Sequence, residues 1–310
     1  MEPLAEGSMV GRILELARDN LAVHKSRGFL SVRQNGTEIG KAELDDIDAV
    51  LVSGQGLTWS NAALAHLAAQ NVPVTILGPN FAPVAVLLPL NGHGEQAYRM
   101  ADQAAASKPL RKQLWARLVR HKIAAQAASL DRLGLRSERL HRLVTSVRSG
   151  DPDNREAQAA QAYWPVLLGK EFRRDISAQG ANALLNYGYA VLRAATARAI
   201  VASGLHPSLS VHHRSGGDAL ALADDMMEPF RPTVDLAVYG LVTSGITRVE
   251  DGRHVLVETL SAPFLTDQGT SPLSQVLLRL AQSFAQSYVS GKAALTFPRQ
   301  PIPSQDVGDD

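Results

Sequence analysis

The chain has 310 residues, of which 45% are hydrophobic and 20% charged, and its formal net charge is only +1. This length exceeds the usual single-domain size, so we expect two domains, each able to bury a core. Cysteine is absent, which excludes disulfides, thiolate nucleophiles and cysteine-based zinc sites. No apolar run reaches the ~18 residues of a membrane span and the N-terminus lacks a signal-peptide pattern, so we expect a cytoplasmic protein.

The N-terminal part has the pattern of a small β-domain. Residues 1–8 show no helical or strand pattern and end in Gly-Ser, so we expect them to be a disordered or vector-derived extension before a natural start at Met9. In residues 9–90, short β-rich runs alternate with turn signals. One helix, NAALAHLAAQN, is capped by Ser60 and ended by Asn71 and Pro73. The predicted strands are RILELA, LAVHK, GFLSVRQ, TEIGKAEL, DAVLVS, PVTILG and VAVLLP.

Residues 91–297 have a helical pattern, because apolar side chains recur every three or four positions. The predicted fold class is therefore α+β, with a small N-terminal β-domain followed by a larger, all-helical C-terminal domain. Residues 298–310 are proline-rich and then acidic, which predicts a flexible tail. The strongest predicted helices cover residues 109–133, 136–148, 154–168, 181–203, 218–228, 233–243 and 272–290.

Positive charge is concentrated in one segment of this otherwise neutral chain. Residues 108–148 contain eleven Lys and Arg against Asp131 and Glu138, a surplus of nine. Such a run is most often the solvated face of long helices. It also fits a surface that contacts nucleic-acid phosphates, if a functional site lies nearby.

An acidic helix is predicted near residues 218–230. Its apolar positions form one stripe, which would leave Asp218, Asp225 and Glu228 on the opposite side, with Asp224 at the border. Asp225 and Glu228 are three residues apart, so their side chains can converge. Pro229 tends to end the helix there, and carboxylates at a helix C-terminus need solvent or a cation. The pattern fits either a metal site or a solvated helix face.

Two adjacent histidines, His212 and His213, precede this helix in a turn whose RSGG sequence can fold back over it. A neutral imidazole together with carboxylates suits Mn²⁺ or Mg²⁺ better than zinc. Each histidine fits equally well as a hydrogen-bonded turn residue, and we expect this of one of the pair.

A second acidic candidate is Glu156, in the segment SGDPDNREAQAAQAYWPVLLG. Asp151 or Asp153 can cap a helix that begins there, and the small alanines around Glu156 allow another helix to approach closely. Taken by itself, Glu156 fits a first-turn glutamate that the helix dipole favours.

Three separated motifs together resemble a known family: DPDNREAQAAQAYW, LNYGYAVLRAATARAIVASGLHPSL and HHRSGGDALALADDMMEPFRPTVD. In this order, and with the β-then-helical layout, they resemble the CRISPR-associated endonuclease and integrase of the spacer-acquisition complex, most closely its type II form. The resemblance runs from Met9 to about Phe297.

The resemblance implies a metal-binding triad for Mg²⁺ or Mn²⁺. Residue by residue, it is carried onto Glu156 in EAQAA, His213 in HHRSGG and Glu228 in DMMEPFRP. Asp225 matches the first acid of the last motif and resembles an auxiliary carboxylate. His212 stands where relatives often carry an apolar residue, so the ligand role is not carried onto it.

The same resemblance implies the activity and the partners. Family members join the 3′-OH ends of a prespacer duplex to the CRISPR repeat by transesterification, as part of CRISPR adaptation in antiviral defence. They form homodimers, to which the N-terminal β-domain would contribute, and a heterohexamer with a small ferredoxin-like partner protein. Type II systems also draw on their effector nuclease, with which contact is expected.

Two other classes of function use the same features. A metal-dependent nuclease acting on branched DNA in repair would need the same triad and basic surface. A non-catalytic DNA-binding scaffold would need only the basic surface, and alanine at Glu156 and Glu228 would then leave every activity unchanged.

Overall fold

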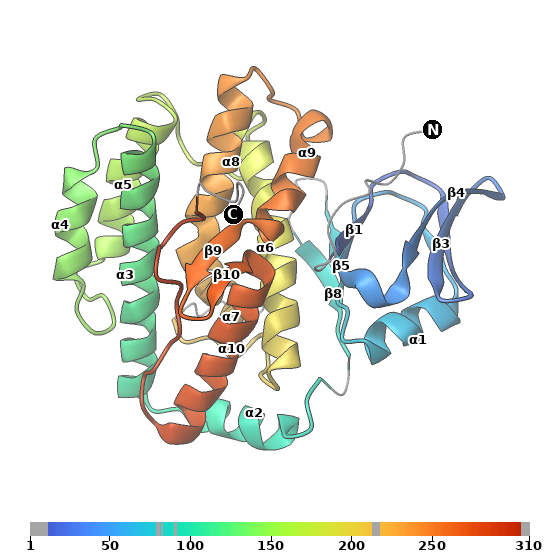
Figure 1. Ribbon diagram of the computed structural model, residues 1–310, viewed down its shortest axis with the longest axis horizontal. Coiled ribbons are helices and arrows are strands. Elements are labelled where there is room, and N and C mark those ends of the chain that lie inside the picture. The colour runs from blue at the N-terminus through green and yellow to red at the C-terminus, as the bar shows by residue number, and fades with distance from the viewer. Residues whose placement is uncertain (1–11, 79–80, 82, 90–91, 213–217, 305–310) are drawn as a thin grey trace.

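The structure is a computed structural model that describes residues 12–78, 81, 83–89, 92–212 and 218–304. The expected extension, residues 1–8, and the candidate ligand His213 lie outside this part. Figure 1 shows a β-rich N-terminal region beside a larger helical region. The predicted α+β layout is therefore confirmed. Among the described residues, no helix is both long and apolar enough to cross a membrane.

Two four-stranded sheets form the N-terminal region, with strand orders β1-β5-β7-β8 and β4-β3-β2-β6. All seven predicted strands are confirmed, and the two-residue β6 was too short to give a sequence signal. The predicted helix is also confirmed, since the Ser60 hydroxyl accepts the N–H of Ala63. The elements are β1 Arg12–Leu16, β2 Leu21–Ser26, β3 Phe29–Gln34, β4 Thr37–Glu43, η1 Leu44–Asp46, β5 Ile47–Val52, β6 Thr58–Trp59, α1 Asn61–Ala69, β7 Val74–Leu77 and β8 Pro83–Leu87.

Strand β5 joins the two regions, because its side chains alternate between two cores. Val50 and Val52 belong to the core of the β-rich region. Ala49 and Leu51 belong to the core of the helical region. The β-rich region is therefore packed directly against the helices, and an Arg198–Asp48 ion pair of 2.5 Å links α6 to β5 at this boundary.

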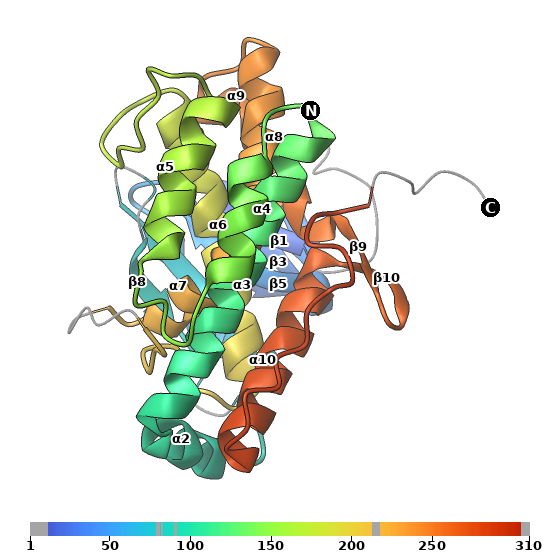
Figure 2. The same cartoon turned by 90° about the vertical axis from the view of Figure 1, so that its left-hand side faces the viewer.

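The helical region is built around α6, which is buried along most of its length. Gly188 of α6 allows α8 to approach closely, since a Cβ there would lie 2.4 Å from Val234 Cγ1. Helices α3, α4 and α5 pack together on the side away from the β-rich region (Figures 1 and 2). The elements are α2 Gln96–Ala105, α3 Lys108–Arg132, α4 Glu138–Ser146, α5 Arg155–Leu167, α6 Ala181–Ala202, α7 Ala221–Met227, η2 Glu228–Phe230, α8 Arg231–Thr243, α9 Val249–Glu258, η3 Thr259–Ser261, β9 Pro263–Thr266, β10 Gly269–Pro272 and α10 Leu273–Ser290.

The seven predicted helices are present, but the expectation of an all-helical C-terminal domain is wrong. Strands β9 and β10 form an antiparallel hairpin whose turn places Gly269 at a φ of +94°. The hairpin buries Phe264, which gives it a place in the helical core. Helices α2 and α9 were not predicted. Gly252 interrupts the apolar pattern of α9, and its missing side chain makes room for Leu241.

The C-terminal segment also differs from the expected flexible tail. Up to Ser304 it runs beside α10 (Figure 2) and makes regular contacts. The backbone N–H of Arg299 donates to the Leu265 carbonyl at 2.8 Å, and that of Ser304 donates to the Pro263 carbonyl at 2.7 Å. Residues 305–310 of the expected tail lie outside the described residues. Directly before this segment, the Phe297 ring stacks on His121 of α3 at 3.5 Å between centroids. Proline lowers the number of conformations to be ordered, so a proline-rich segment is readily held in such contacts.

Candidate functional site

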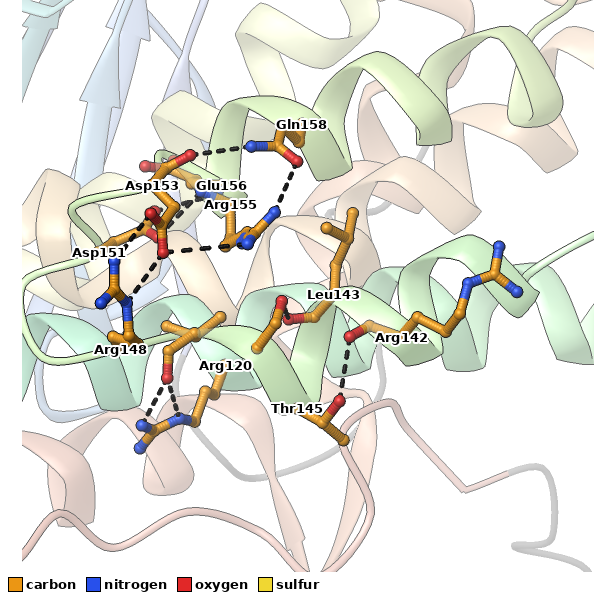
Figure 3. A network of polar contacts seen from close by, with 12 residues as sticks. Arg120, Arg142, Leu143, Thr145, Arg148, Asp151, Asp153, Arg155, Glu156 and Gln158 are labelled. Carbon is orange, nitrogen blue, oxygen red and sulfur yellow. Dashed lines mark hydrogen bonds and ion pairs between the residues drawn. The ribbon is translucent and has the colours of Figure 1, made fainter.

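Glu156 lies in the first turn of α5 and is held there by a cap. The carboxylate of Asp151 accepts the backbone N–H groups of Arg155 and Glu156, at 2.9 and 3.0 Å. Asn154, in the left-handed conformation, caps the helix through its side chain. Asp153 instead pairs with Arg148 (Figure 3). Of the two expected capping aspartates, Asp151 therefore fixes the start of the helix and with it the position of Glu156.

Glu228 lies where α7 passes into α8 through the short turn η2. Pro229 follows it, and the regular α-helical pattern is interrupted there, as the sequence predicted. Of the two interpretations of the acidic helix, the solvated face does not apply to Glu228 and Asp225. Glu228 is 3% exposed and Asp225 is fully buried, because α3 and α8 pack against η2 and α6 packs against α7.

The two glutamates meet at a single lysine. Lys122 of α3 places its Nζ 2.6 Å from Glu156 Oε1 and 2.5 Å from Glu228 Oε2. The other oxygen of Glu228 pairs with Arg231 at 3.1 Å. Two carboxylates that are 72 positions apart in the sequence are thereby brought to one point by α3, α5 and η2. We call Glu156, Glu228, Lys122 and Arg231 the carboxylate centre.

The electrostatics of the centre follow from this proximity. Burial alone would lower the pKa of Lys122, but the charges of Glu228 and Glu156 outweigh burial and raise it. For Arg231, burial likewise opposes the charged form, but the surrounding acidic groups, with Glu228 first among them, together outweigh burial, so its pKa is also raised. Both cations therefore stay charged, and each stabilises a carboxylate that would otherwise be costly to bury.

Two buried side chains, Tyr189 and Asp235, support Arg231. Its guanidinium lies over the Tyr189 ring at 4.7 Å from the centroid. The Tyr189 hydroxyl donates to the carboxylate of Asp235, which is 2% exposed. Burial raises the pKa of Asp235 to about 7, and the Tyr189 hydrogen bond only partly opposes this. Arg231 is thus fixed on two sides, by Glu228 and by an aromatic ring.

The residues beside the expected histidine ligand are also fixed. Asp225 Oδ2 accepts the backbone N–H groups of Val211 and His212, at 2.8 and 3.0 Å. The His212 ring stacks on Trp115 of α3, with centroids 4.1 Å apart and the planes parallel within 1°. Asp225 therefore anchors the backbone of Val211 and His212, and the His212 ring packs against an aromatic side chain. The choice of His213 over His212 as a ligand stays a prediction.

The remaining acids of the predicted helix pair with an arginine outside the carboxylate centre. Arg193 of α6 pairs with Asp218 at 2.7 Å and with Asp224 at 2.6 Å. These contacts tie the start of α7 to the central helix. We assign Asp218 and Asp224 to holding the fold.

The donor set of the carboxylate centre fits a hard divalent cation. Among the residues that the structure describes, no three His, Asp or Glu side chains gather closely enough to hold a metal ion. Glu156 and Glu228 nevertheless place one oxygen each within 2.6 Å of the same cationic nitrogen. Oxygen ligands of this kind are those that Mg²⁺ and Mn²⁺ prefer.

The eleven basic residues of the segment differ in exposure, and the half-buried Arg111 donates to the Ala104 carbonyl at 3.0 Å. Lys122 points into the centre, and Arg132 donates to the carbonyl of Pro303. These two side chains are used inside the molecule, so the surplus of nine charges overstates the basic surface. Arg120 keeps part of its side chain exposed while its guanidinium donates to the Val147 carbonyl (Figure 3). The exposed basic residues of the segment are Lys108, Lys112, Arg117, Arg120, Arg136, Arg139, Arg142 and Arg148.

Sequence reasoning missed Lys122 and Arg231 as parts of the site. A signal was available for Lys122, because Leu118, Val119, Ala125 and Gln126, its neighbours one turn away along the helix, are all buried. A lysine within such a stripe needs a partner. Arg231 follows Glu228 by three residues, a spacing at which side chains on one helix face meet.

The fold and the centre define an α+β protein with paired carboxylates in its helical part, and comparison with known proteins gives its family. The model of the family "CRISPR associated protein Cas1" matches residues 14–272. A CRISPR-associated endonuclease Cas1 of Neisseria meningitidis is 39% identical over 226 residues, which cover 72% of this chain and 74% of the relative. The chain therefore belongs to the Cas1 family of CRISPR-associated endonucleases.

Other relatives agree with this assignment. A Cas1 of Pyrobaculum aerophilum is 28% identical and covers 86% of this chain and 95% of its own length. Two solved structures share the fold: a casposase bound to its integration product, with a TM-score of 0.80, 22% identity and 96% coverage of both chains, and a Cas1 of Thermotoga maritima, with a TM-score of 0.74, 14% identity and coverage of 92% and 99%. The resemblance found in the sequence is confirmed for the family, and the type II form stays a prediction.

Proposed function

We propose that this chain is a metal-dependent integrase that joins the 3′-OH ends of prespacer DNA to the CRISPR repeat. The observation that carries the proposal is that Glu156 and Glu228 both contact one cationic group, the Lys122 ammonium of helix α3. Glu156, His213 and Glu228 would hold Mg²⁺ or Mn²⁺. Two carboxylates and an imidazole leave several positions of the ion free for oxygens of the DNA.

The reaction exchanges one phosphodiester bond for another. The 3′-oxygen of the prespacer bonds to a phosphorus of the repeat, the 3′-oxygen of the repeat strand leaves, and the proton of the attacking hydroxyl passes to that leaving oxygen or to solvent. Because the number of phosphodiester bonds is unchanged, no ATP is needed. A bound divalent ion supplies the Lewis acid that activates the hydroxyl and neutralises charge at the phosphate.

The residues of this chain prepare the geometry for that step. Asp151 fixes the backbone of Glu156. Arg231 holds Glu228 Oε1, which leaves Oε2 on the Lys122 ammonium that Glu156 also contacts. Asp225 anchors the two residues before His213. Glu156 and Glu228 are therefore each positioned by a neighbour that is not itself a proposed ligand, which is the usual support of a metal site.

The proposed partners follow from the family and its structural relatives. A Cas6-RT-Cas1–Cas2 complex shares the fold with a TM-score of 0.75, at 18% identity. We propose that this chain likewise works as a homodimer, in a heterohexamer with a small Cas2-type partner, in the cytoplasm. Contact with a type II effector nuclease belongs to the same proposal.

A strand-joining assay tests the function. The protein, with and without the Cas2-type partner, is incubated in Mn²⁺ with a 3′-OH duplex and a supercoiled plasmid carrying the CRISPR repeat. We expect joined products that disappear with a 3′-dideoxy duplex, with EDTA or with Glu156→Ala, and persist with Glu138→Ala, which removes an exposed glutamate of α4. Cleavage of branched DNA without joining would favour a repair nuclease. DNA binding without joining, unchanged by Glu156→Ala, would favour a scaffold.

A further inference from the structure

One ammonium group lies between the two glutamates of the carboxylate centre. Lys122 Nζ contacts Glu156 Oε1 at 2.6 Å and Glu228 Oε2 at 2.5 Å. The side chains are 12%, 21% and 4% exposed for Lys122, Glu156 and Glu228, respectively. The ammonium therefore occupies the position at which both carboxylates can be reached at once.

The carboxylates of Glu156 and Glu228 need a nearby cation both with and without bound metal. Like charges at this distance repel, and an ionised carboxylate that is nearly buried is costly unless it is paired. An ammonium and a divalent ion both meet this need. They cannot do so together at contact distance, because each repels the other, so one must leave when the other arrives.

The second cation of the centre is held differently. Arg231 pairs with the other oxygen of Glu228 and lies over the Tyr189 ring. Lys122 is a point charge on a flexible stem, and its Nζ is held by the two carboxylates themselves. Arg231 can therefore remain in place while Lys122 moves, which makes Lys122 the exchangeable cation.

We infer that Lys122 is the internal counter-cation of the metal-free centre and competes with the divalent ion for Glu156 and Glu228. The inference rests on the proposed metal site. Its first consequence is that wild-type protein stays folded without metal. Its second is that the cost of displacing Lys122 offsets part of the free energy of metal binding. The side chain thus stabilises the resting protein and weakens metal binding.

Direct Mn²⁺ binding tests the inference without an activity assay. The dissociation constant is measured at pH 8 by the electron paramagnetic resonance signal of free Mn²⁺, and thermal unfolding is followed with and without Mn²⁺. We expect Lys122→Met to bind Mn²⁺ about tenfold more tightly or better than wild type, a change of about 1.4 kcal/mol. Without metal its melting temperature should fall by roughly 5 °C or more, and Mn²⁺ should raise it by more than it raises that of wild type.

Matched variants separate this effect from a general loss of positive charge. Lys112→Met removes an exposed lysine of the same helix and should leave the dissociation constant within about twofold of wild type. Lys122→Arg keeps the charge and can hold a carboxylate with two hydrogen bonds, so it should bind Mn²⁺ no more tightly than wild type. If Lys122→Met cannot be purified without metal, Lys122→Gln carries the same expectation.

The outcomes distinguish this inference from the proposed function. If wild type binds Mn²⁺ and Glu156→Ala abolishes that binding, the metal site stands. Folded Lys122→Met with unchanged or weaker Mn²⁺ binding would then overturn the competition alone. If wild type binds no Mn²⁺ at the centre, the metal site and this inference both fail.

Discussion

One basic segment of the sequence supplies residues in two different environments: Lys122, and the arginines Arg117, Arg139 and Arg142. Lys122 is nearly buried between two carboxylates, whereas the three arginines are exposed. The difference arises from the position of each residue relative to the apolar stripe of its helix. A run of charge therefore predicts neither a surface nor a site until each residue is placed on its helix face.

The largest effect is expected where the carboxylate centre is broken. Glu156→Ala and Glu228→Ala should each lower strand joining at least about a hundredfold, because the metal loses a ligand. Their stabilities should differ. Glu228→Ala leaves Lys122 and Arg231 without their shared partner and should cost about 3 kcal/mol, whereas Glu156 is 21% exposed and its removal should cost about 1 kcal/mol or less.

Joining rates and urea unfolding of both variants measure these effects. Exposed Glu138→Ala serves as the control, with no change in either quantity. Joining at the wild-type rate would remove the tested glutamate from the site, and equal stability of the two variants would contradict the difference in burial.

The two histidines should separate in the same assay. His213→Ala should lose Mn²⁺-dependent joining, whereas His212→Ala should keep most of it and lose about 1 kcal/mol of stability with its stack on Trp115. The pair is assayed side by side at matched Mn²⁺ concentrations. An inactive His212→Ala beside an active His213→Ala would mean that the ligand position is shifted by one residue.

The exposed arginines should affect DNA binding and leave the metal site intact. If Arg117, Arg139 and Arg142 neutralise DNA phosphates, replacing all three by glutamate should flatten the slope of log K against log salt. The expected change is about 0.9 for each phosphate that is no longer neutralised. Mn²⁺ binding should not change. An unchanged slope in a folded triple variant would make these residues an ordinary solvated face.

The smallest effect on joining is expected from the buried Asp235. Here a change of pH should alter the free energy of unfolding. Burial raises the pKa of Asp235 to about 7, so the folded protein holds this proton while the unfolded chain releases it at a lower pH. The unfolding free energy should therefore fall between about pH 4 and pH 7, by up to about 1.4 kcal/mol per unit. Asp235→Asn should flatten this part of the profile in urea unfolding, and parallel profiles for the two proteins would argue against a raised pKa.

The sequence predicted most of the fold because its local signals agree with the tertiary packing. The strands and the Ser60 cap follow from alternation and turn residues. The β9–β10 hairpin was missed because its strands are only four residues long. Helix α9 was missed because Gly252 interrupts its apolar pattern, and the reason for a glycine there is the close approach of Leu241, which is distant in the sequence.

The site was predictable only in part. Motifs identified Glu156 and Glu228, but periodicity placed Glu228 opposite the apolar stripe of its helix and did not show that α3 and α8 bury it. Lys122 was counted as surface charge, since nothing in the sequence brings α3 beside both glutamates. Which residues share a site is decided by long-range packing, which local patterns do not contain.

The central claim is that Glu156 and Glu228 share one divalent ion, and a crystal soaked in Mn²⁺ tests it most directly. Anomalous diffraction should show one strong peak at about 2.2 Å from an oxygen of each glutamate, with His213 as the third ligand and Lys122 Nζ moved away. A peak elsewhere, or no peak with Lys122 still between the two carboxylates in a crystal that takes up Mn²⁺, would contradict the account.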